Sequence, residues 1–127
     1  MTKKFVLALL VAAAPSAALQ AQNMPLPQFL TKATALEKKG AMAIFSGDLR
    51  LLQKEIKQSM PILRQERLAA EKAGRKGAFC PRAGQKVEIG AKELLTYFRS
   101  IPPAQREQMR VKDGMRSFMA RRMPCPA

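Results

Sequence analysis

The sequence predicts an all-α fold, a small bundle of four to five helices with one disulfide in the C-terminal half. Apolar residues recur three or four positions apart in four separate stretches, which is the spacing of one helix face. Glycines and prolines separate these stretches and mark the helix ends. The only two cysteines, Cys80 and Cys125, lie at the two ends of the C-terminal half.

Residues 1–21 have the pattern of a secretory signal peptide. Lys3 and Lys4 precede an apolar stretch that is too short to span a bilayer, and small residues follow it. Cleavage fits after either Ala18 or Ala21. The alternative is that the stretch remains as a membrane anchor. The sequence therefore predicts a periplasmic or secreted protein that is not membrane-spanning, because no second apolar run has spanning length.

The mature part, residues 22–127, is predicted to form one small helical domain with two parts. The N-terminal part, residues 22–77, starts with a proline-rich segment and an amphipathic helix from about Gln28 to Lys39. A short apolar piece, residues 41–45, makes one more helical turn. The longest helix follows, from about residue 49 to residue 74, with an apolar stripe on one side and bases on the others.

Pro61 interrupts this longest helix. Proline removes one helical hydrogen bond, so the helix either kinks there or stops and restarts with Ser59 as its cap. The apolar periodicity continues through the proline, which favours a single kinked helix. Either Ser46 or Asp48 can cap the start of the helix. Residues 74–77, Gly-Arg-Lys-Gly, end it and mark the boundary between the two parts.

The C-terminal part, residues 78–127, is predicted to begin with a loop over residues 78–89. A helix then starts near Ala91 and ends before the two consecutive prolines that follow Ile101. Residues 105–109 form a short helical turn. The last helix runs from about Val111 to Arg122.

The two cysteines are predicted to form a structural disulfide. In an oxidising compartment, two thiols with no other partner most simply pair with each other, here Cys80 with Cys125. Closing a loop of this size contributes about 4 kcal/mol in the chain-entropy estimate. The alternative is a redox-active or metal-binding cysteine, which requires a close second cysteine, a histidine or a cationic site. The chain has no histidine, and the spacing is too wide for a Cys-x-x-Cys motif.

Composition argues against an enzyme. Histidine, the usual residue for proton transfer at neutral pH and for zinc, is absent. The nine carboxylates are scattered among bases. Pairs such as Glu66 with Glu71, or Glu88 with Glu93, could serve a hydrolase, but they are typical of solvated helix charges. There is no phosphate-binding loop, nucleophile motif or metal motif, so we expect no catalytic residue, no cofactor and no metal.

Positive charge is the strongest compositional signal. The formal net charge is +14, and removing the two lysines of the signal leaves 21 bases against 9 acids, or +12. Residues 23–79 and residues 80–127 each carry +6. This surplus favours an anionic partner, such as an acidic protein or an anionic polymer. The composition argues against nucleic acid as a partner, because aromatics make up only 6% of the residues and offer few stacking platforms. The sequence is also compatible with a homodimer.

Methionines and arginines share the last helix. Met115, Met119 and Met123 fall four residues apart, and an exposed thioether cluster could hold Cu(I). Methionine also fills irregular cores well, and we expect these side chains to lie in the core.

Arginines give the only candidate binding residues. Arg116, Arg121 and Arg122 form a candidate partner-binding basic face, with a merely solvated basic surface as the alternative.

Residues 80–125 resemble the Rap/Tai-type immunity proteins. The resemblance lies in two cysteines, two proline motifs and apolar spacing: Cys80-Pro81, Val87, Glu93-Leu94-Leu95, Tyr97-Phe98, Pro102-Pro103, Val111, Met115, Phe118 and Met123-Pro124-Cys125. Members of this family are small, exported, helical, disulfide-bearing proteins of Gram-negative bacteria. They bind and block peptidoglycan amidase effectors delivered by type VI secretion. Residues 23–79 do not match the family pattern, so only the disulfide and the core positions are carried over.

The resemblance implies an exported, non-catalytic immunity-type inhibitor that occludes the active site of a peptidoglycan amidase. The acidic partner expected from the charge is then that amidase. The alternative is a basic envelope protein that binds an anionic polymer or serves as a structural or stress module.

Overall fold

The computed structural model describes residues 23–127, so the predicted signal peptide, residues 1–21, and its cleavage site lie outside the described residues. Within the described range the fold is all-α, as predicted, and a disulfide joins Cys80 to Cys125. The elements in chain order are α2 (Leu26–Lys39), the 3-10 helix η1 (Gly40–Phe45), α3 (Gly47–Lys72), α4 (Ala91–Ser100), α5 (Pro103–Arg106) and α6 (Val111–Arg122).

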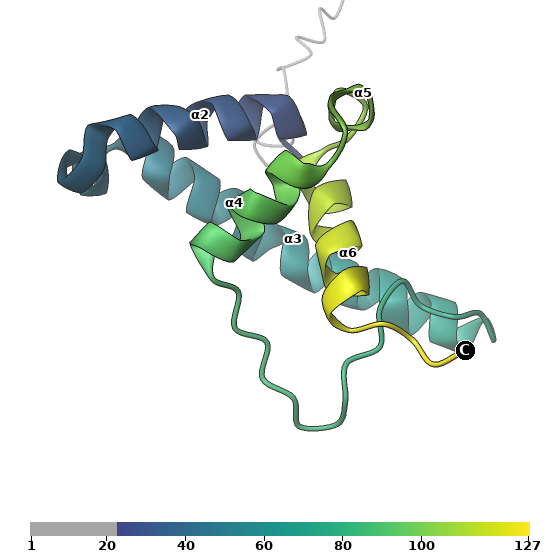
Figure 1. Cartoon of the computed structure of the whole chain (residues 1–127). Helices are drawn as coiled ribbons and strands as arrows, with labels where there is room; N and C mark the ends of the chain where they lie inside the picture. The colour runs from purple at the N-terminus through teal and green to yellow at the C-terminus, as the bar shows by residue number, and fades with distance from the viewer. Residues whose placement is uncertain (1–22) are drawn as a thin grey trace, which may run out of the picture.

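α3 is the longest helix and lies behind the others in Figure 1. α6 and α2 pack against it, and α4 packs against both α6 and α2. Helices from before and after the linker at residues 74–77 therefore share one hydrophobic core. A long loop, residues 73–90, extends away from this core before the chain returns to form α4 (Figure 1).

α2 starts at Leu26, two residues earlier than expected. Pro25 precedes the helix and Pro27 lies in its first turn. Backbone N–H groups in the first turn have no acceptor within the helix, so proline, which lacks an N–H, is compatible with the start of a helix. Gly40 ends α2 with a φ of 54°, a left-handed conformation that glycine adopts without strain.

α3 is continuous through Pro61, so the predicted single helix is confirmed and the restart at Ser59 is wrong. Ser59 lies buried inside the helix, where its hydroxyl donates to the carbonyl of Glu55 at 2.8 Å. Ser46 caps the helix start by accepting the N–H of Asp48 at 3.3 Å. The Asp48 carboxylate binds Lys32 of α2 instead, at 2.8 Å.

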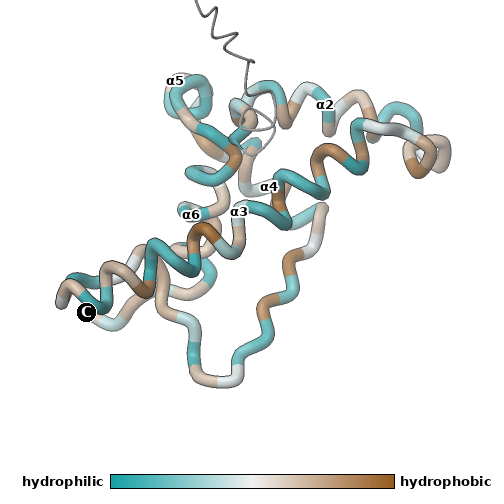
Figure 2. Tube along the Cα trace, turned by 180° about the vertical axis from the view of Figure 1, so that it is seen from behind, coloured by the Kyte–Doolittle hydropathy of each residue, from teal (hydrophilic) through white to brown (hydrophobic). Residues whose placement is uncertain are grey.

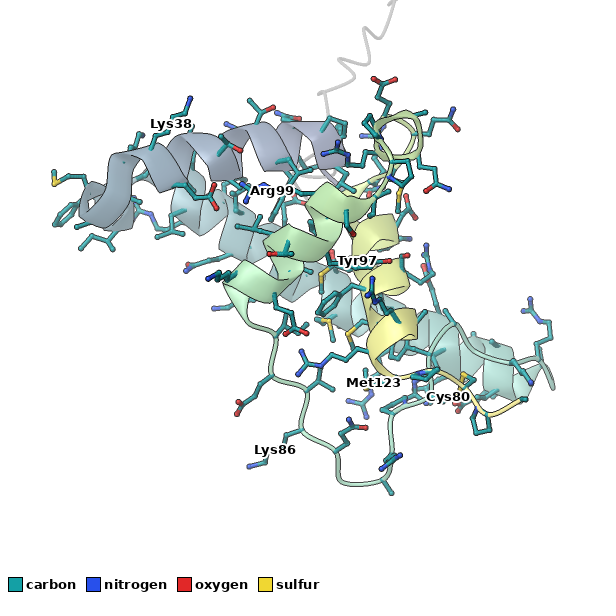
Figure 3. The ribbon with its side chains drawn as sticks, viewed as in Figure 1. Lys38, Cys80, Lys86, Tyr97, Arg99 and Met123 are labelled. Carbon is teal, nitrogen blue, oxygen red and sulfur yellow. A yellow bond between two sulfur atoms is a disulfide. The ribbon has the colours of Figure 1, made fainter. Side chains whose placement is uncertain are left out.

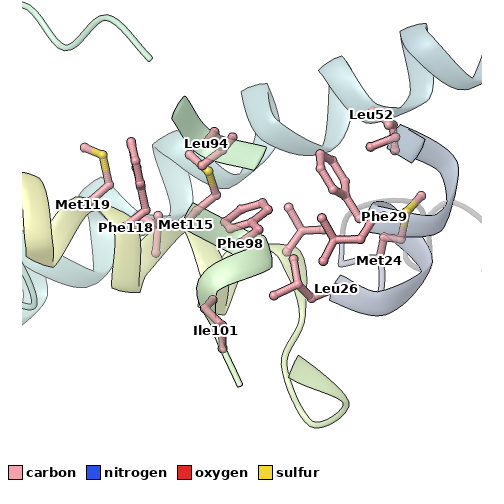
Figure 4. Packing of buried hydrophobic residues seen from close by; sticks show 14 of the residues in the cluster. Met24, Leu26, Phe29, Leu52, Leu94, Phe98, Ile101, Met115, Phe118 and Met119 are labelled. Carbon is pink, nitrogen blue, oxygen red and sulfur yellow. The ribbon is translucent and has the colours of Figure 1, made fainter. Parts of the chain in front are cut away.

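The core is centred on aromatic and thioether side chains (Figure 4). Phe98 of α4 is fully buried and meets Phe29 of α2 edge to face, with ring centroids 5.7 Å apart. Met115, Met119 and Met123 are also buried, which confirms their predicted place in the core. A Cu(I) site on these sulfurs would need them to be exposed together, and they are not.

The disulfide joins Cys80, within the long loop, to Cys125, in the segment that follows α6. The backbone N–H of Cys80 donates to the carbonyl of Met123 at 2.9 Å, and the neighbouring Phe79 is buried in the core. Disulfides of this structural kind are typical of proteins that fold in an oxidising compartment outside the cytoplasm. No helix in residues 23–127 combines the length and the apolar character that crossing a membrane requires.

Candidate partner-binding surface

The structure separates the three arginines of the predicted basic face. Arg116 lies on the side of α6 that meets α3, where it is half-buried and bonded to Glu66 and Asp113. Arg121 and Arg122 lie toward α4. These two are exposed, so they are the members of the predicted face that a partner could reach.

Glu66 is the centre of the ion-pair network that holds Arg116. Its two carboxylate oxygens accept hydrogen bonds from Lys112 at 2.9 Å and from Arg116 at 2.7 Å. Partial burial acts to raise the pKa of Glu66, but the bonds from the two cations outweigh it and lower the pKa. Asp113 behaves in the same way, with its pKa lowered against the effect of burial by the Arg110 N–H and the Arg116 guanidinium. The network therefore joins α3 to α6.

Tyr97 and Arg121 form the exposed contact between α4 and α6. The Arg121 guanidinium lies over the Tyr97 ring, 5.7 Å from its centroid, and the Tyr97 hydroxyl shares a hydrogen bond with Ser117. Ser117 and Arg121 stand one helical turn apart on α6, so both reach the same ring. Figure 3 shows Tyr97 lying between the two helices. We call Tyr97, Ser100, Ser117, Arg121 and Arg122 the Tyr97 surface.

Two open hollows meet at the Tyr97 surface. One, of about 520 Å³, extends toward α5, and the other, of about 410 Å³, lies along α4 and the end of α6. Tyr97, Ser100 and Arg121 line both hollows. An aromatic ring, a hydroxyl and a guanidinium thus stand between two concave regions that a partner's side chains could enter.

The packing beneath the Tyr97 surface fixes its geometry. The Tyr97 ring meets Phe118 edge to face, with centroids 5.5 Å apart, and it also lies against Phe98. Arg122 binds Glu93 of α4 at 3.0 Å, which adds a second link between the two helices. Such a surface is pre-organised, so a partner would order few side chains on binding it.

The Tyr97 surface consists of groups that can bind a partner, namely an aromatic ring, hydroxyls and guanidinium groups. Glu93 is its only lining carboxylate and is paired with Arg122. Of the other carboxylates considered as pairs, Glu66 is held as described and Glu71 is held by Arg67 at 2.7 Å, whereas Glu88 is exposed and has no base within 4 Å in residues 23–127. Across residues 23–127, no three of the histidine, cysteine, aspartate or glutamate side chains gather as a metal site would require.

A third hollow lies between α2, α3 and α4 and has a mainly apolar lining. Its lining includes Leu49, Ile56, Ile89 and Leu95, which are only partly buried. It has no tyrosine or arginine, the residue types that most often dominate binding energy in protein interfaces. We therefore place the candidate site at the Tyr97 surface.

Glu55 is a buried charge that the sequence did not single out. The side chain is fully buried in α3, one carboxylate oxygen accepts the Met24 N–H at 3.1 Å, and the other oxygen has no hydrogen-bond partner in residues 23–127. Burial raises the pKa of Glu55, although the Met24 N–H opposes this. Its position on the apolar side of α3, between Leu52 and Ser59, was the only signal in the sequence.

No protein-family model, curated protein or solved structure matches this chain. The likeness of residues 80–125 to Rap/Tai-type immunity proteins stays a prediction from cysteine and apolar spacing. A function for the chain is therefore inferred from its surfaces.

Proposed function

We propose that this chain is an exported, non-catalytic inhibitor of the immunity type, which binds an acidic protein through the Tyr97 surface. The candidate partner is a peptidoglycan amidase effector of type VI secretion, whose active site the bound protein would occlude. The observation that carries the proposal is the pairing of Tyr97 with Arg121 between two hollows on a rigid helix junction.

The composition of the surface supports protein binding. Tyrosine and arginine are enriched among the few residues that supply most of the binding energy in protein interfaces, and they work best where hollows exclude water around them. A periplasmic inhibitor needs no catalytic groups. It needs a fixed surface, which the ring contacts of Tyr97 and the Arg122–Glu93 ion pair provide.

The charge distribution supports an acidic partner. Ion pairs occupy six of the nine carboxylates, namely Glu37, Asp48, Glu66, Glu71, Glu93 and Asp113. Arg121 has no carboxylate within 4 Å in the described part of the chain. Its charge is therefore available to a carboxylate of the partner, and the overall positive field would speed association with an acidic protein.

The first experiment uses the mature, disulfide-bonded protein to capture its partner from an envelope extract, with Arg121→Glu and Arg82→Glu side by side. Arg82 is exposed in the long loop, so its reversal makes the same charge change away from the Tyr97 surface. Mass spectrometry should identify a peptidoglycan amidase held by the wild type and by Arg82→Glu, and lost from Arg121→Glu. Capture of the same partner by all three proteins would contradict the proposed site.

The second experiment measures inhibition. A peptidoglycan amidase encoded beside this chain's gene should be blocked at about equimolar inhibitor when it digests purified peptidoglycan. Reversing a hot-spot arginine typically costs at least about 2 kcal/mol, so Arg121→Glu should require roughly 30 times more protein. Inhibition should persist at about 0.5 M salt, whereas binding to an anionic polymer would be largely lost. An amidase that the wild type leaves fully active refutes the proposed function.

A further inference from the structure

α3 carries a line of basic side chains on the side that faces solvent. We call this set the α3 stripe, and it consists of Arg50, Lys54, Lys57, Arg64 and Lys72, all exposed. Because consecutive residues of an α-helix are rotated by about 100°, all five lie within about 40° of the direction of Arg50. The stripe is about 33 Å long at 1.5 Å per residue.

The α3 stripe lies opposite the side of the helix that enters the core. Leu52, Glu55, Ser59 and Leu63 are the buried residues of α3, and they point in the opposite direction. Figure 2, seen from behind, shows α3 crossing the near side of the molecule. The stripe therefore forms an outward-facing ridge on α3, and of its five residues Lys57 alone lines a hollow described above.

The carboxylates of α3 do not neutralise the stripe. Asp48 binds Lys32, Glu66 binds Arg116 and Lys112, and Glu71 binds Arg67. None of the five bases has a carboxylate within 4 Å in residues 23–127. The stripe thus concentrates positive charge that remains uncompensated by the protein itself.

Exposed apolar side chains adjoin the N-terminal end of the stripe. Met42, Ile44 and Phe45 of η1 are 65%, 67% and 74% exposed, and Phe45 precedes Arg50 by only five residues. Three large apolar side chains exposed together are unusual on a water-facing tip. Beside a basic helix, they match the arrangement of proteins that bind at a lipid–water interface.

We propose that the α3 stripe and the apolar tip of η1 dock this protein on the surface of an anionic phospholipid bilayer. A line of long basic side chains on an outward-facing ridge suits a flat array of phosphate groups, with the apolar tip entering the headgroup region. A protein partner fits less well, because lysine is depleted in protein interfaces and the stripe has no aromatic residue. Single-stranded nucleic acid would need several stacking platforms along the strand, whereas in residues 23–127 Phe45, at one end of the stripe, is the only largely exposed aromatic side chain.

This docking would leave the Tyr97 surface free. α4 and α6 lie in front of α3 in Figure 1, and the stripe lies on the side of α3 opposite the buried residues that pack into the core. A bilayer that contacts the stripe would therefore lie on the opposite side of the molecule from Tyr97. Because the two surfaces are separate, a failed docking test would leave the proposed inhibition untouched.

The test measures binding of the mature protein to vesicles by co-sedimentation, using phosphatidylcholine vesicles with and without phosphatidylglycerol. The stripe variant changes four bases, Lys54→Gln, Lys57→Gln, Arg64→Gln and Lys72→Gln. The control variant loses the same charge from exposed positions elsewhere, Lys38→Gln, Arg82→Gln, Lys86→Gln and Lys92→Gln. Both variants have the same net charge, so a difference between their vesicle affinities shows that the position of the charge matters.

The wild type should bind only the vesicles that contain phosphatidylglycerol. At about fivefold per basic residue at an anionic surface, the stripe variant should bind at least a hundredfold more weakly, whereas the control variant should lose less than about tenfold. Equal losses in the two variants would overturn the proposal, because they would mean that net charge alone drives binding. Binding of the wild type to soluble polyphosphate but not to anionic vesicles would overturn it as well, in favour of a polymer.

A fluorescence measurement tests the apolar tip. The chain has no tryptophan, so Phe45→Trp introduces a single reporter at an exposed position. Its emission should shift to shorter wavelength on adding anionic vesicles, and the shift should vanish when the four stripe changes are added. An unshifted emission from vesicle-bound Phe45→Trp protein would show that the tip stays in water and refute its part in docking.

Discussion

Replacing Gly114 with alanine tests a close contact between helices in the core. A Cβ atom at Gly114 of α6 would lie 2.9 Å from Cε1 and 3.3 Å from Cζ of Phe98, and 3.3 Å from Cδ2 of Leu26. Carbon atoms in good contact are about 3.5–4.0 Å apart, so the added methyl group requires a neighbour to move. Phe98 and Leu26 are both fully buried, and Phe29 holds the Phe98 ring edge to face.

Two opposing effects determine how far Gly114→Ala lowers the free energy of unfolding. Alanine in place of glycine within a helix gains about 1 kcal/mol in propensity. Inserting a methyl group into a packed core costs about 1–3 kcal/mol, and the fully enclosed Phe98 ring places this site toward the upper end. We therefore expect Gly114→Ala to lower the free energy of unfolding by about 1–2 kcal/mol, which for a domain of this size lowers the Tm by roughly 4–16 °C.

Urea unfolding followed by far-UV circular dichroism measures this loss, with Gly47→Ala as the matched control. Gly47 is the first residue of α3, its φ is not left-handed, and an added Cβ would meet nothing within 4 Å. The control should be neutral or slightly more stable than the wild type. A Gly114→Ala protein as stable as Gly47→Ala would refute the reasoning, since α6 could then move away from α4 without cost.

Two further predictions concern the disulfide and the buried carboxylate. Replacing Cys80 and Cys125 together with alanine should lower the free energy of unfolding by about 4 kcal/mol, because the disulfide joins residues 45 positions apart and so restricts the unfolded chain. A loss below about 1 kcal/mol in urea unfolding would contradict this. Burial raises the pKa of Glu55 above its ordinary 4.5, so the folded protein binds this proton more tightly than the unfolded chain does. The free energy of unfolding of the wild type should therefore fall as the pH rises from about 4.5 through the pKa of Glu55 in the folded protein. Glu55→Gln should not show this fall, so its stability relative to the wild type should increase with pH and then level off. If unfolding curves across a pH series show the same difference in stability at every pH, Glu55 does not ionise in its buried position.

α3, α4 and α6 could be predicted because the sequence specifies each of them locally. The limits of α6, Val111 to Arg122, follow from apolar spacing that ends at Met123-Pro124, and the continuous α3 follows from periodicity that persists across Pro61. The start of α2 was missed because the proline-rich entry resembles a linker, although prolines are equally compatible with a first helical turn. That choice depends on a long-range contact. Leu26 donates its N–H to the Met109 carbonyl at 2.9 Å, which fixes the start of the helix.

The binding surface could be predicted only in part. Arg116, Arg121 and Arg122 are close in sequence, but α6 directs Arg116 toward Glu66, a partner 50 positions earlier in the chain. Periodicity shows which side of a helix is apolar, and it does not show which bases on the polar sides will meet a carboxylate of another helix. The convergence of Tyr97 with Arg121 likewise depends on how α4 packs against α6.

The same limitation explains why the α3 stripe could be predicted only in part: the sequence places bases on the polar sides of this helix, and the structure shows which of them have no carboxylate partner in residues 23–127. In the sequence the positive charge is evenly divided, +6 in each of residues 23–79 and 80–127. Folding then separates paired from unpaired charge, because three carboxylates of α3, Asp48, Glu66 and Glu71, bind other bases, while the outward bases have no carboxylate within 4 Å in residues 23–127. The buried side of α3 therefore contributes to the stability of the core, and the opposite side presents the unpaired positive charge. For this reason, each of the four stripe changes should alter the unfolding free energy by no more than about 0.5 kcal/mol, or about 2 kcal/mol together, so that the variant stays folded and a change in vesicle binding reports on the surface.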